Sequence, residues 1–179
     1  AARHVGVTPA QSIASLVRFA GIKRRLELRG TVHGVSVYDD FAHHPTAIAL
    51  TVGGLRRREP QGRILAVLEP RSNTMKLGVM KAQLPASLVD ADAVFCYSNG
   101  LGWDAAEALA PLGERARTYG ELDALVADVV AAAQAAIDAQ AGLEGSRLQQ
   151  TLVLRLEHPS VVAGENDERV VRDALLVER

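Results

Sequence analysis

The chemistry of this chain is concentrated in one short segment, Tyr38–Thr46, with the sequence YDDFAHHPT. Two carboxylates, two imidazoles and a hydroxyl follow alternating apolar positions at 35–37, a pattern typical of a strand that ends in a polar turn. Pro45 suits the first turn of a helix, because that position needs no backbone N–H. Open α/β sheets bind ligands at the carboxyl ends of their strands, so Asp39 and Asp40 are candidate ligand-binding residues.

Two ordinary explanations compete with a ligand site in this segment. An aspartate before a helix is usually a cap, and paired histidines in a loop are usually only hydrated. We expect no metal ligands here, because adjacent histidines point in different directions. The His-x-x-x-His spacing and the cysteine partners that are typical of zinc sites are also missing.

Two further polar segments follow apolar runs at 64–68 and 93–97. At the ends of parallel strands they would share one sheet edge with Asp40, which makes them candidate binding loops. The candidate side chains are Arg71, Ser72, Asn73, Thr74, Ser98 and Asn99. The alternative is that Ser72 and Asn73 only form the turn before a helix.

The elements that would position these segments alternate along the chain. Strands are predicted near 25–28, 35–38, 64–68, 93–97, 117–119 and 151–154, and helices near 45–58, 75–88, 103–109, 121–139 and 166–176. The first two strands could form a hairpin through 30–34, whereas helices separate the later strands and favour parallel crossovers. The predicted fold class is α/β, an open, mostly parallel, Rossmann-like sheet with helices on both faces.

Composition limits the possible functions. A chain of 179 residues is long enough for one good domain and not for three. A net charge of −1 argues against a nucleic-acid partner, and no apolar stretch reaches membrane-span length or resembles a signal peptide. The single cysteine, Cys96, lies in an apolar run and is predicted to be a buried strand residue.

The first twenty residues look like the end of another domain. Residues 1–7 read as a helix tail that ends at Gly6, and Thr8 with Pro9 would begin a second helix. Two helical pieces before the first strand indicate a longer protein. We therefore expect residues 1–20 to belong to a preceding domain and residues 21–179 to form a second one.

The segment DDFAHHPT resembles the signature at the start of the C-terminal domain of the Mur ligases, which are ATP-dependent, amide-bond-forming enzymes of bacterial cell-wall synthesis. Upstream, residues 19–27 (FAGIKRRLE) resemble the same region of the family. Downstream, residues 71–76 (RSNTMK) are similar to the members that join a recycled tripeptide to UDP-N-acetylmuramate, and residues 98–103 (SNGLGW) are compatible with them. The alanine-adding members carry a histidine-arginine-tyrosine motif at 71–76 and are the close alternative.

The resemblance implies a role for each candidate residue. Arg25 would reach the ATP phosphates, and Asp40 would contribute to nucleotide binding, so these two are the catalytic candidates. His43 and His44 would contact the nucleotide or order the loop. The segments that begin at Arg71 and at residue 98 would bind the amino substrate. Arg24 should point to the opposite face of a strand from its neighbour and ranks lower.

The resemblance also implies what the rest of the enzyme supplies. The family is understood to react through an acyl phosphate made from ATP, which requires a phosphate cradle and magnesium. This sequence has no Gly-x-x-x-x-Gly-Lys-Ser/Thr segment, which the family carries in its central domain. We therefore expect ATP and Mg²⁺ to be held mainly by the central domain, and this chain alone to be inactive. The expected partners are UDP-N-acetylmuramate, the murein tripeptide and the central and N-terminal domains, in the bacterial cytoplasm. A non-catalytic nucleotide-binding module is the alternative from a different functional class.

The sequence after about residue 155 departs from the family pattern. Instead of a glycine-rich loop like Ser-Asn-Gly-Gly, residues 157–168 read EHPSVVAGENDE. A reading-frame change, a divergent terminus or a different subfamily would each explain this. Because relatives use this loop to shape the amino-substrate pocket, the departure concerns the substrate more than the fold.

Overall fold

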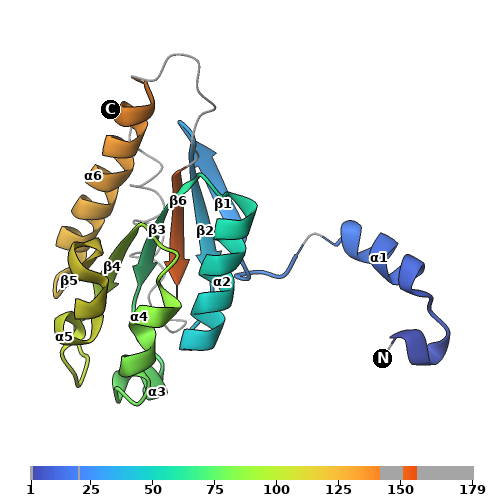
Figure 1. Ribbon diagram of the computed structural model, residues 1–179, viewed down its shortest axis with the longest axis horizontal. Coiled ribbons are helices and arrows are strands. Elements are labelled where there is room, and N and C mark those ends of the chain that lie inside the picture. The colour runs from blue at the N-terminus through green and yellow to red at the C-terminus, as the bar shows by residue number, and fades with distance from the viewer. Residues whose placement is uncertain (1, 20, 142–150, 157–179) are drawn as a thin grey trace.

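A computed structural model describes residues 2–19, 21–141 and 151–156. Among them is a six-stranded sheet with the order β1-β2-β6-β3-β4-β5 (Figure 1). Its strands are β1 (Glu27–Val32), β2 (Val35–Asp40), β3 (Arg63–Leu68), β4 (Ala93–Tyr97), β5 (Ala116–Tyr119) and β6 (Thr151–Leu156). All neighbouring strands are parallel except β1 and β2, which are antiparallel. The predicted open, mostly parallel sheet is confirmed.

The predicted hairpin exists, but its turn is tighter than expected. The two residues between β1 and β2 are His33 and Gly34, with φ of 48° and 79°. Positive φ at both central positions is what a two-residue hairpin turn of type I′ requires. Gly30 is not part of the turn; it lies inside β1, where the register with β2 shifts after Leu28.

The helices are α1 (Pro9–Val17), α2 (Pro45–Arg58), α3 (Asn73–Lys76), α4 (Leu84–Ser87), α5 (Ala105–Leu109) and α6 (Leu122–Ala141). Short 3₁₀ turns lie at η1 (Ala2–Val5), η2 (Lys81–Gln83) and η3 (Ala110–Arg115). The single helix predicted near 75–88 is wrong. Gly78 has a φ of 72° just beyond the C-cap of α3, a position where glycine commonly ends a helix, and the chain resumes only as η2 and α4.

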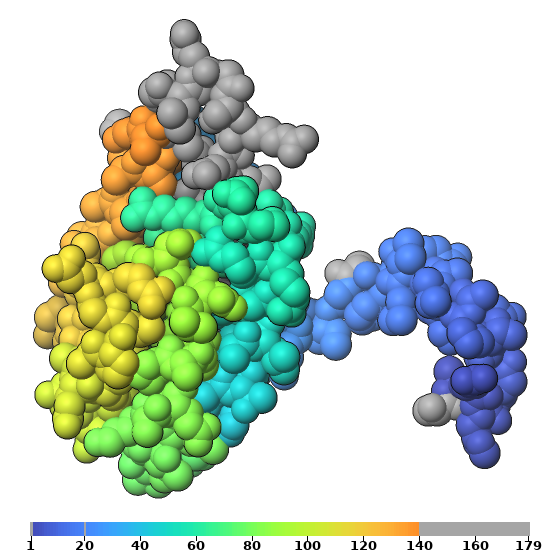
Figure 2. Space-filling model, viewed as in Figure 1, coloured from blue at the N-terminus to red at the C-terminus, as the bar shows by residue number. Residues whose placement is uncertain are grey.

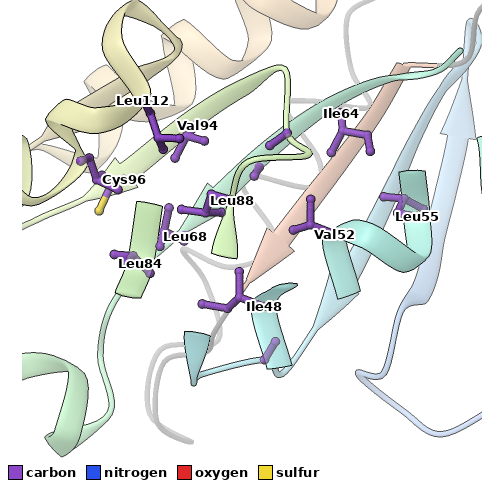
Figure 3. Packing of buried hydrophobic residues seen from close by; sticks show 14 of the residues in the cluster. Ile48, Val52, Leu55, Ile64, Leu68, Leu84, Leu88, Val94, Cys96 and Leu112 are labelled. Atoms are coloured by element: carbon purple, nitrogen blue, oxygen red, sulfur yellow. The ribbon is translucent and has the colours of Figure 1, made fainter. Parts of the chain in front are cut away.

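Helices cover both faces of the sheet, as predicted. On one face, Leu125, Val129 and Ala133 of α6 pack against alternate residues of the strands, including Val37. On the other face lie α2, α4 and α5. Figure 3 shows Ile48, Val52 and Leu55 of α2 packed in this second core, which also contains Leu84, Leu88 and the buried Cys96. The side chains of β2, β3 and β4 thus alternate between two apolar cores, and these strands are buried on both faces.

The N-terminal helices stand clear of the sheet (Figures 1 and 2). Thr8 caps α1 through a reciprocal capping box with Gln11, so the predicted helix start is confirmed. No residue of α1 is buried, and Leu16 is 67% exposed. Phe19, just beyond the helix, is 58% exposed.

Two further expectations concern the ends and the surface. The atypical segment 157–168 and the helix predicted at 166–176 lie outside the described residues. Among the helices that the structure describes, none combines the length and the apolar character needed to cross a membrane.

Candidate functional site

The carboxyl ends of three parallel strands gather most of the predicted site residues at one edge of the sheet. Asp40 ends β2, residues 69–72 follow β3, and residues 98–100 follow β4. The loop after β4 is attached to the end of β5, because both the backbone N–H and the hydroxyl of Ser98 donate to the Tyr119 carbonyl, at 2.8 and 3.1 Å. The sheet therefore brings the predicted segments to the same edge.

Asp40 is a buried carboxylate that joins two backbone segments. It is 4% exposed. Its Oδ2 accepts a hydrogen bond from the Leu26 N–H at 2.7 Å, and its Oδ1 accepts one from the Ala42 N–H at 2.8 Å. It thus ties the approach to β1 to the turn after β2, and it is not the cap of α2.

The cap of α2 is His44, whose Nδ1 accepts from the Thr46 N–H at 3.2 Å. The Nδ1 of His43 lies 2.9 Å from the Phe41 carbonyl oxygen, which can only accept a hydrogen bond. Nδ1 is therefore the donor in His43 and the acceptor in His44, so the neutral rings are opposite tautomers. His43 is exposed and His44 is half-buried, which makes His43 the better placed of the two to meet a ligand.

Arg24 and Arg25 do not lie on opposite faces of a strand, as the sequence had suggested. They precede β1, in a turn where Arg24 and Leu26 have φ of 59° and 47°, so strand alternation does not apply. The Arg24 Nε donates to Asp39 Oδ2 at 3.3 Å, and Asp39 is 7% exposed. Arg24 thus forms an ion pair with a buried carboxylate, whereas the side chain of Arg25 is exposed at the same edge.

Phe41 contacts several of the candidate residues, although sequence reasoning did not single it out. Its ring centroid lies 5.4 Å from the Arg24 guanidinium carbon and 5.8 Å from that of Arg25, both within cation–π range. The His43 ring is 4.9 Å away, centroid to centroid. Because the ring is 40% exposed, it holds two cations beside open surface. Its position inside the DDFAHH segment was the available signal.

The side chains in the loop after β3 are of two kinds: some form contacts within the protein, and others are exposed. Arg71 Nη1 lies 3.3 Å from Glu69 Oε1 in a partly exposed ion pair. Ser72 caps α3, and its Oγ accepts from the Met75 N–H at 3.4 Å, so this residue does form the turn before the helix. Asn73 and Thr74 are exposed and remain the better candidates for contact with a ligand.

The loop after β4 shows the same division. The hydroxyl of Ser98 is used within the protein, as described above, while Asn99 is exposed and its Nδ2 donates to the Tyr97 hydroxyl at 3.2 Å. Trp103 was quoted only as part of a motif, yet its Nε1 donates to the Met75 carbonyl at 2.7 Å. A contact between the loops after β3 and β4 depends on this tryptophan.

Tyr119, at the end of β5, is not a candidate base. Burial raises its pKa to about 12, and the hydrogen bond to Asp128 and the charge of that carboxylate act in the same direction. The tyrosine hydroxyl donates to Asp128 Oδ2 at 2.8 Å, and Arg117 lies 3.3 Å from the same oxygen. The phenol therefore stays neutral and attaches β5 to α6.

The donor set of this edge suits anions better than cations. Arg25, Phe41 and His43 present a guanidinium, a ring and an imidazole on the exposed side. Within the described residues, no group of three or more histidine, cysteine, aspartate or glutamate side chains could hold a metal ion.

The chain is similar in sequence and in structure to known enzymes. The family model described as "Mur ligase, glutamate ligase domain" matches residues 24–143. The UDP-N-acetylmuramate–L-alanyl-gamma-D-glutamyl-meso-2,6-diaminoheptandioate ligase of Escherichia coli K12 is 50% identical over 136 residues, which cover 75% of this chain and 30% of that protein.

Two further matches add to this comparison. A UDP-N-acetylmuramate–L-alanine ligase of Clavibacter sepedonicus is 48% identical over only 66 residues, which cover 37% of this chain and 14% of that protein. The crystal structure of a murein peptide ligase from Psychrobacter arcticus matches with a TM-score of 0.65 and 28% identity, over 99% of this chain and 35% of that one. This chain therefore spans less than two fifths of the length of each of the three proteins.

Proposed function

The chain belongs to the Mur ligase family, and we propose that it is the C-terminal domain of an ATP-dependent ligase that joins L-alanyl-γ-D-glutamyl-meso-diaminopimelate to UDP-N-acetylmuramate. The observation that carries this proposal is the 50% identity with the E. coli tripeptide ligase over 136 residues. The similarity to the L-alanine ligase of C. sepedonicus extends over 66 residues. An edge with an exposed arginine suits a reaction in which negative charge moves between phosphate and carboxylate groups.

Arg25 is the residue that we propose to meet the ATP phosphates. Its side chain is exposed, and its guanidinium carbon lies 5.8 Å from the centroid of the Phe41 ring. A planar cation that stays protonated is suited to phosphate oxygens. ATP, when bound, would supply the γ-phosphoryl group that activates the carboxylate, with ADP as the leaving group. The residues at this edge would orient the phosphates and stabilise developing charge, with Mg²⁺ held mainly by protein outside this segment.

Asp40, His43 and His44 complete the proposed nucleotide side of the edge. A carboxylate can accept about four hydrogen bonds, and the two backbone contacts of Asp40 leave acceptor capacity for a ribose hydroxyl. The same contacts hold Leu26, next to Arg25, against the turn. His43 would contact the nucleotide directly, while His44 would order the loop through its cap.

The loops after β3 and β4 form the proposed amino-substrate side. The incoming tripeptide carries several carboxylates, and Arg71 is the cation in this loop. Asn73 and Thr74, close to it in sequence, and Asn99, in the loop after β4, offer exposed amide and hydroxyl groups. The hydroxyls of Ser72 and Ser98 would act by holding the loops in shape. The nucleotide and the amine would thus be held by loops that follow different strands.

The remaining proposals concern the rest of the enzyme. Residues 1–20 would be the end of a central ATPase domain, and the exposed apolar residues of α1 fit a surface that the rest of the protein covers. The central and N-terminal domains would supply the phosphate cradle and the UDP-N-acetylmuramate site. The reaction would take place in the bacterial cytoplasm, as part of peptidoglycan recycling.

The test is a substrate comparison with the complete protein that contains this chain. ADP release in the presence of ATP, Mg²⁺ and UDP-N-acetylmuramate should depend on the tripeptide, and L-alanine should support little or none. Strong activity with L-alanine alone would favour the alanine-ligase alternative. ATP binding without ADP release for either amine would favour a non-catalytic nucleotide-binding module.

A further inference from the structure

The loop that carries Arg71 contains a helix too short to hold itself in place. Helix α3 has only four residues. A single helical turn is unstable by itself, because fixing its backbone costs more free energy than its few hydrogen bonds return. Its position must therefore come from contacts with the rest of the domain. Two of these are local, namely the Ser72 cap and the Met75 side chain, which is 2% exposed in the core beside α2.

A third contact comes from a different loop and acts on the backbone of α3. The Trp103 Nε1 donates to the Met75 carbonyl at 2.7 Å, and the Gly102 N–H donates to the Lys76 carbonyl at 3.4 Å. Trp103 itself packs against the core on the α2 side of the sheet. The indole therefore connects the end of α3 to a rigid part of the domain.

Gly78 makes this contact possible. A Cβ built on Gly78 would lie 2.9 Å from the Trp103 Cδ1, closer than real Cβ atoms come, and its φ of 72° disfavours other residues. The glycine thus serves two purposes, ending α3 and admitting the indole. The loop after β3 and the loop after β4 are held together as one unit at this point.

We propose that Trp103 is a positioning residue for the amino substrate: by fixing α3, it aligns Arg71 and the exposed Asn73 and Thr74 with the carboxylates of the incoming peptide. This inference rests on the proposed function. Trp103 need not touch the peptide. A guanidinium recognises a carboxylate through a planar pair of hydrogen bonds, so a small displacement of the loop weakens recognition. The residues proposed for the nucleotide lie before β1 and at or just after the end of β2 instead, and they should not depend on the indole.

The test uses the complete enzyme with Trp103→Phe, which keeps an aromatic ring and removes the N–H. Loss of one neutral hydrogen bond should raise the KM for the tripeptide by about threefold to tenfold, while the KM for ATP stays close to the parent value. Tyr119→Phe is the matched control, because it also deletes one aromatic donor at this edge but leaves α3 untouched. It should leave the KM for the tripeptide unchanged.

Gly78→Ala perturbs the same contact from the other side. The added methyl group should displace the indole and raise the tripeptide KM, and combining it with Trp103→Phe should give less than the product of the two single effects. Equal rises in both KM values, or a parental tripeptide KM in Trp103→Phe, would overturn the inference while leaving the proposed function intact. A parent enzyme that ligates L-alanine and not the tripeptide would overturn both.

Discussion

At the scale of single residues, the candidate site is defined by which polar groups the fold already uses. Asp39 holds Arg24, Asp40 accepts two backbone N–H groups, and Ser72 caps a helix. Arg25 and His43 are the exposed groups beside them. Some of these neighbouring residues therefore stabilise the fold, and others face solvent. Mutations in the first group should change stability, and mutations in the second should change activity.

Arg24 and Arg25 should show this difference between stability and activity most clearly. In the complete enzyme, Arg25→Ala should lower kcat by about 30- to 1000-fold, because a charge-assisted contact with the phosphates is worth roughly 2–4 kcal/mol in the transition state. Arg24→Ala should have a much smaller effect on turnover. It should instead lower the free energy of unfolding by about 1–3 kcal/mol, since Asp39 is left buried without its partner.

Steady-state rates and urea unfolding of both variants make this comparison. Similar, small changes in kcat for the two variants would show that the nucleotide side has been misplaced. An Arg24→Ala protein of parental stability would show that the Asp39 pair contributes little.

Arg71→Ala addresses the amino-substrate side. Removing a guanidinium from a carboxylate contact costs about 2–5 kcal/mol, mostly through the unpaired partner. We therefore expect a large rise in the KM for the tripeptide and a nearly unchanged KM for ATP, both measured in the complete enzyme. A rise in the ATP value alone would assign the loop after β3 to the nucleotide.

At the scale of elements, helix ends place the site. Helix α2 begins at Pro45 with His44 as its cap, and α3 begins at Asn73 with Ser72 as its cap. Both helices follow strands whose apolar residues are buried, so each cap sets the direction in which the chain leaves the sheet. The cap at His44 also determines where the exposed His43 lies.

The His44 cap can be tested without changing its neighbours. His44→Asn keeps a side-chain acceptor at the N-cap and should leave stability nearly unchanged, whereas His44→Ala should cost about 1 kcal/mol. The measurement is the free energy of unfolding from urea titration, with Thr46→Ala as a control at an exposed position of the same helix. Equal losses for the asparagine and alanine variants would mean that the imidazole acts other than as a cap.

At the scale of the whole molecule, we propose that the chain supplies one part of an active site. Its sheet and two cores hold the proposed nucleotide and amine loops at one edge, but its sequence has no phosphate loop. Apolar residues of α1, such as Leu16 and Val17, are 67% and 81% exposed, which suits contact with a further domain.

The purified 179-residue chain should therefore release no ADP above background when given ATP, Mg²⁺, UDP-N-acetylmuramate and tripeptide. The complete protein, assayed at the same molar concentration, is the positive control. Substrate-dependent ADP release by the chain alone would show that the phosphate-binding groups lie within it, contrary to the proposed division of labour.

Much of the fold followed from local rules. Apolar alternation at 35–37 and the runs at 64–68 and 93–97 determined the strands, because strands covered by helices on both faces are mostly apolar. Pro45, Thr8 and the alanine-rich stretch before residue 140 determined the helix positions, since caps and propensities act over a few residues. The order of strand ends then placed the candidate loops at one edge, and the motif sequence identified the family.

Other features depend on contacts between residues that are far apart in sequence, which local sequence patterns do not predict. Arg24 and Arg25 share one side of a turn because Asp39 and Phe41, far along the chain, hold them there. The helix predicted at 75–88 is interrupted because Gly78 adopts a positive φ that admits Trp103 from the next loop. Asp40 became a junction between two backbone segments because folding placed the Leu26 N–H within its reach. In each case the deciding partner is remote in sequence, and only the tertiary structure brings it close.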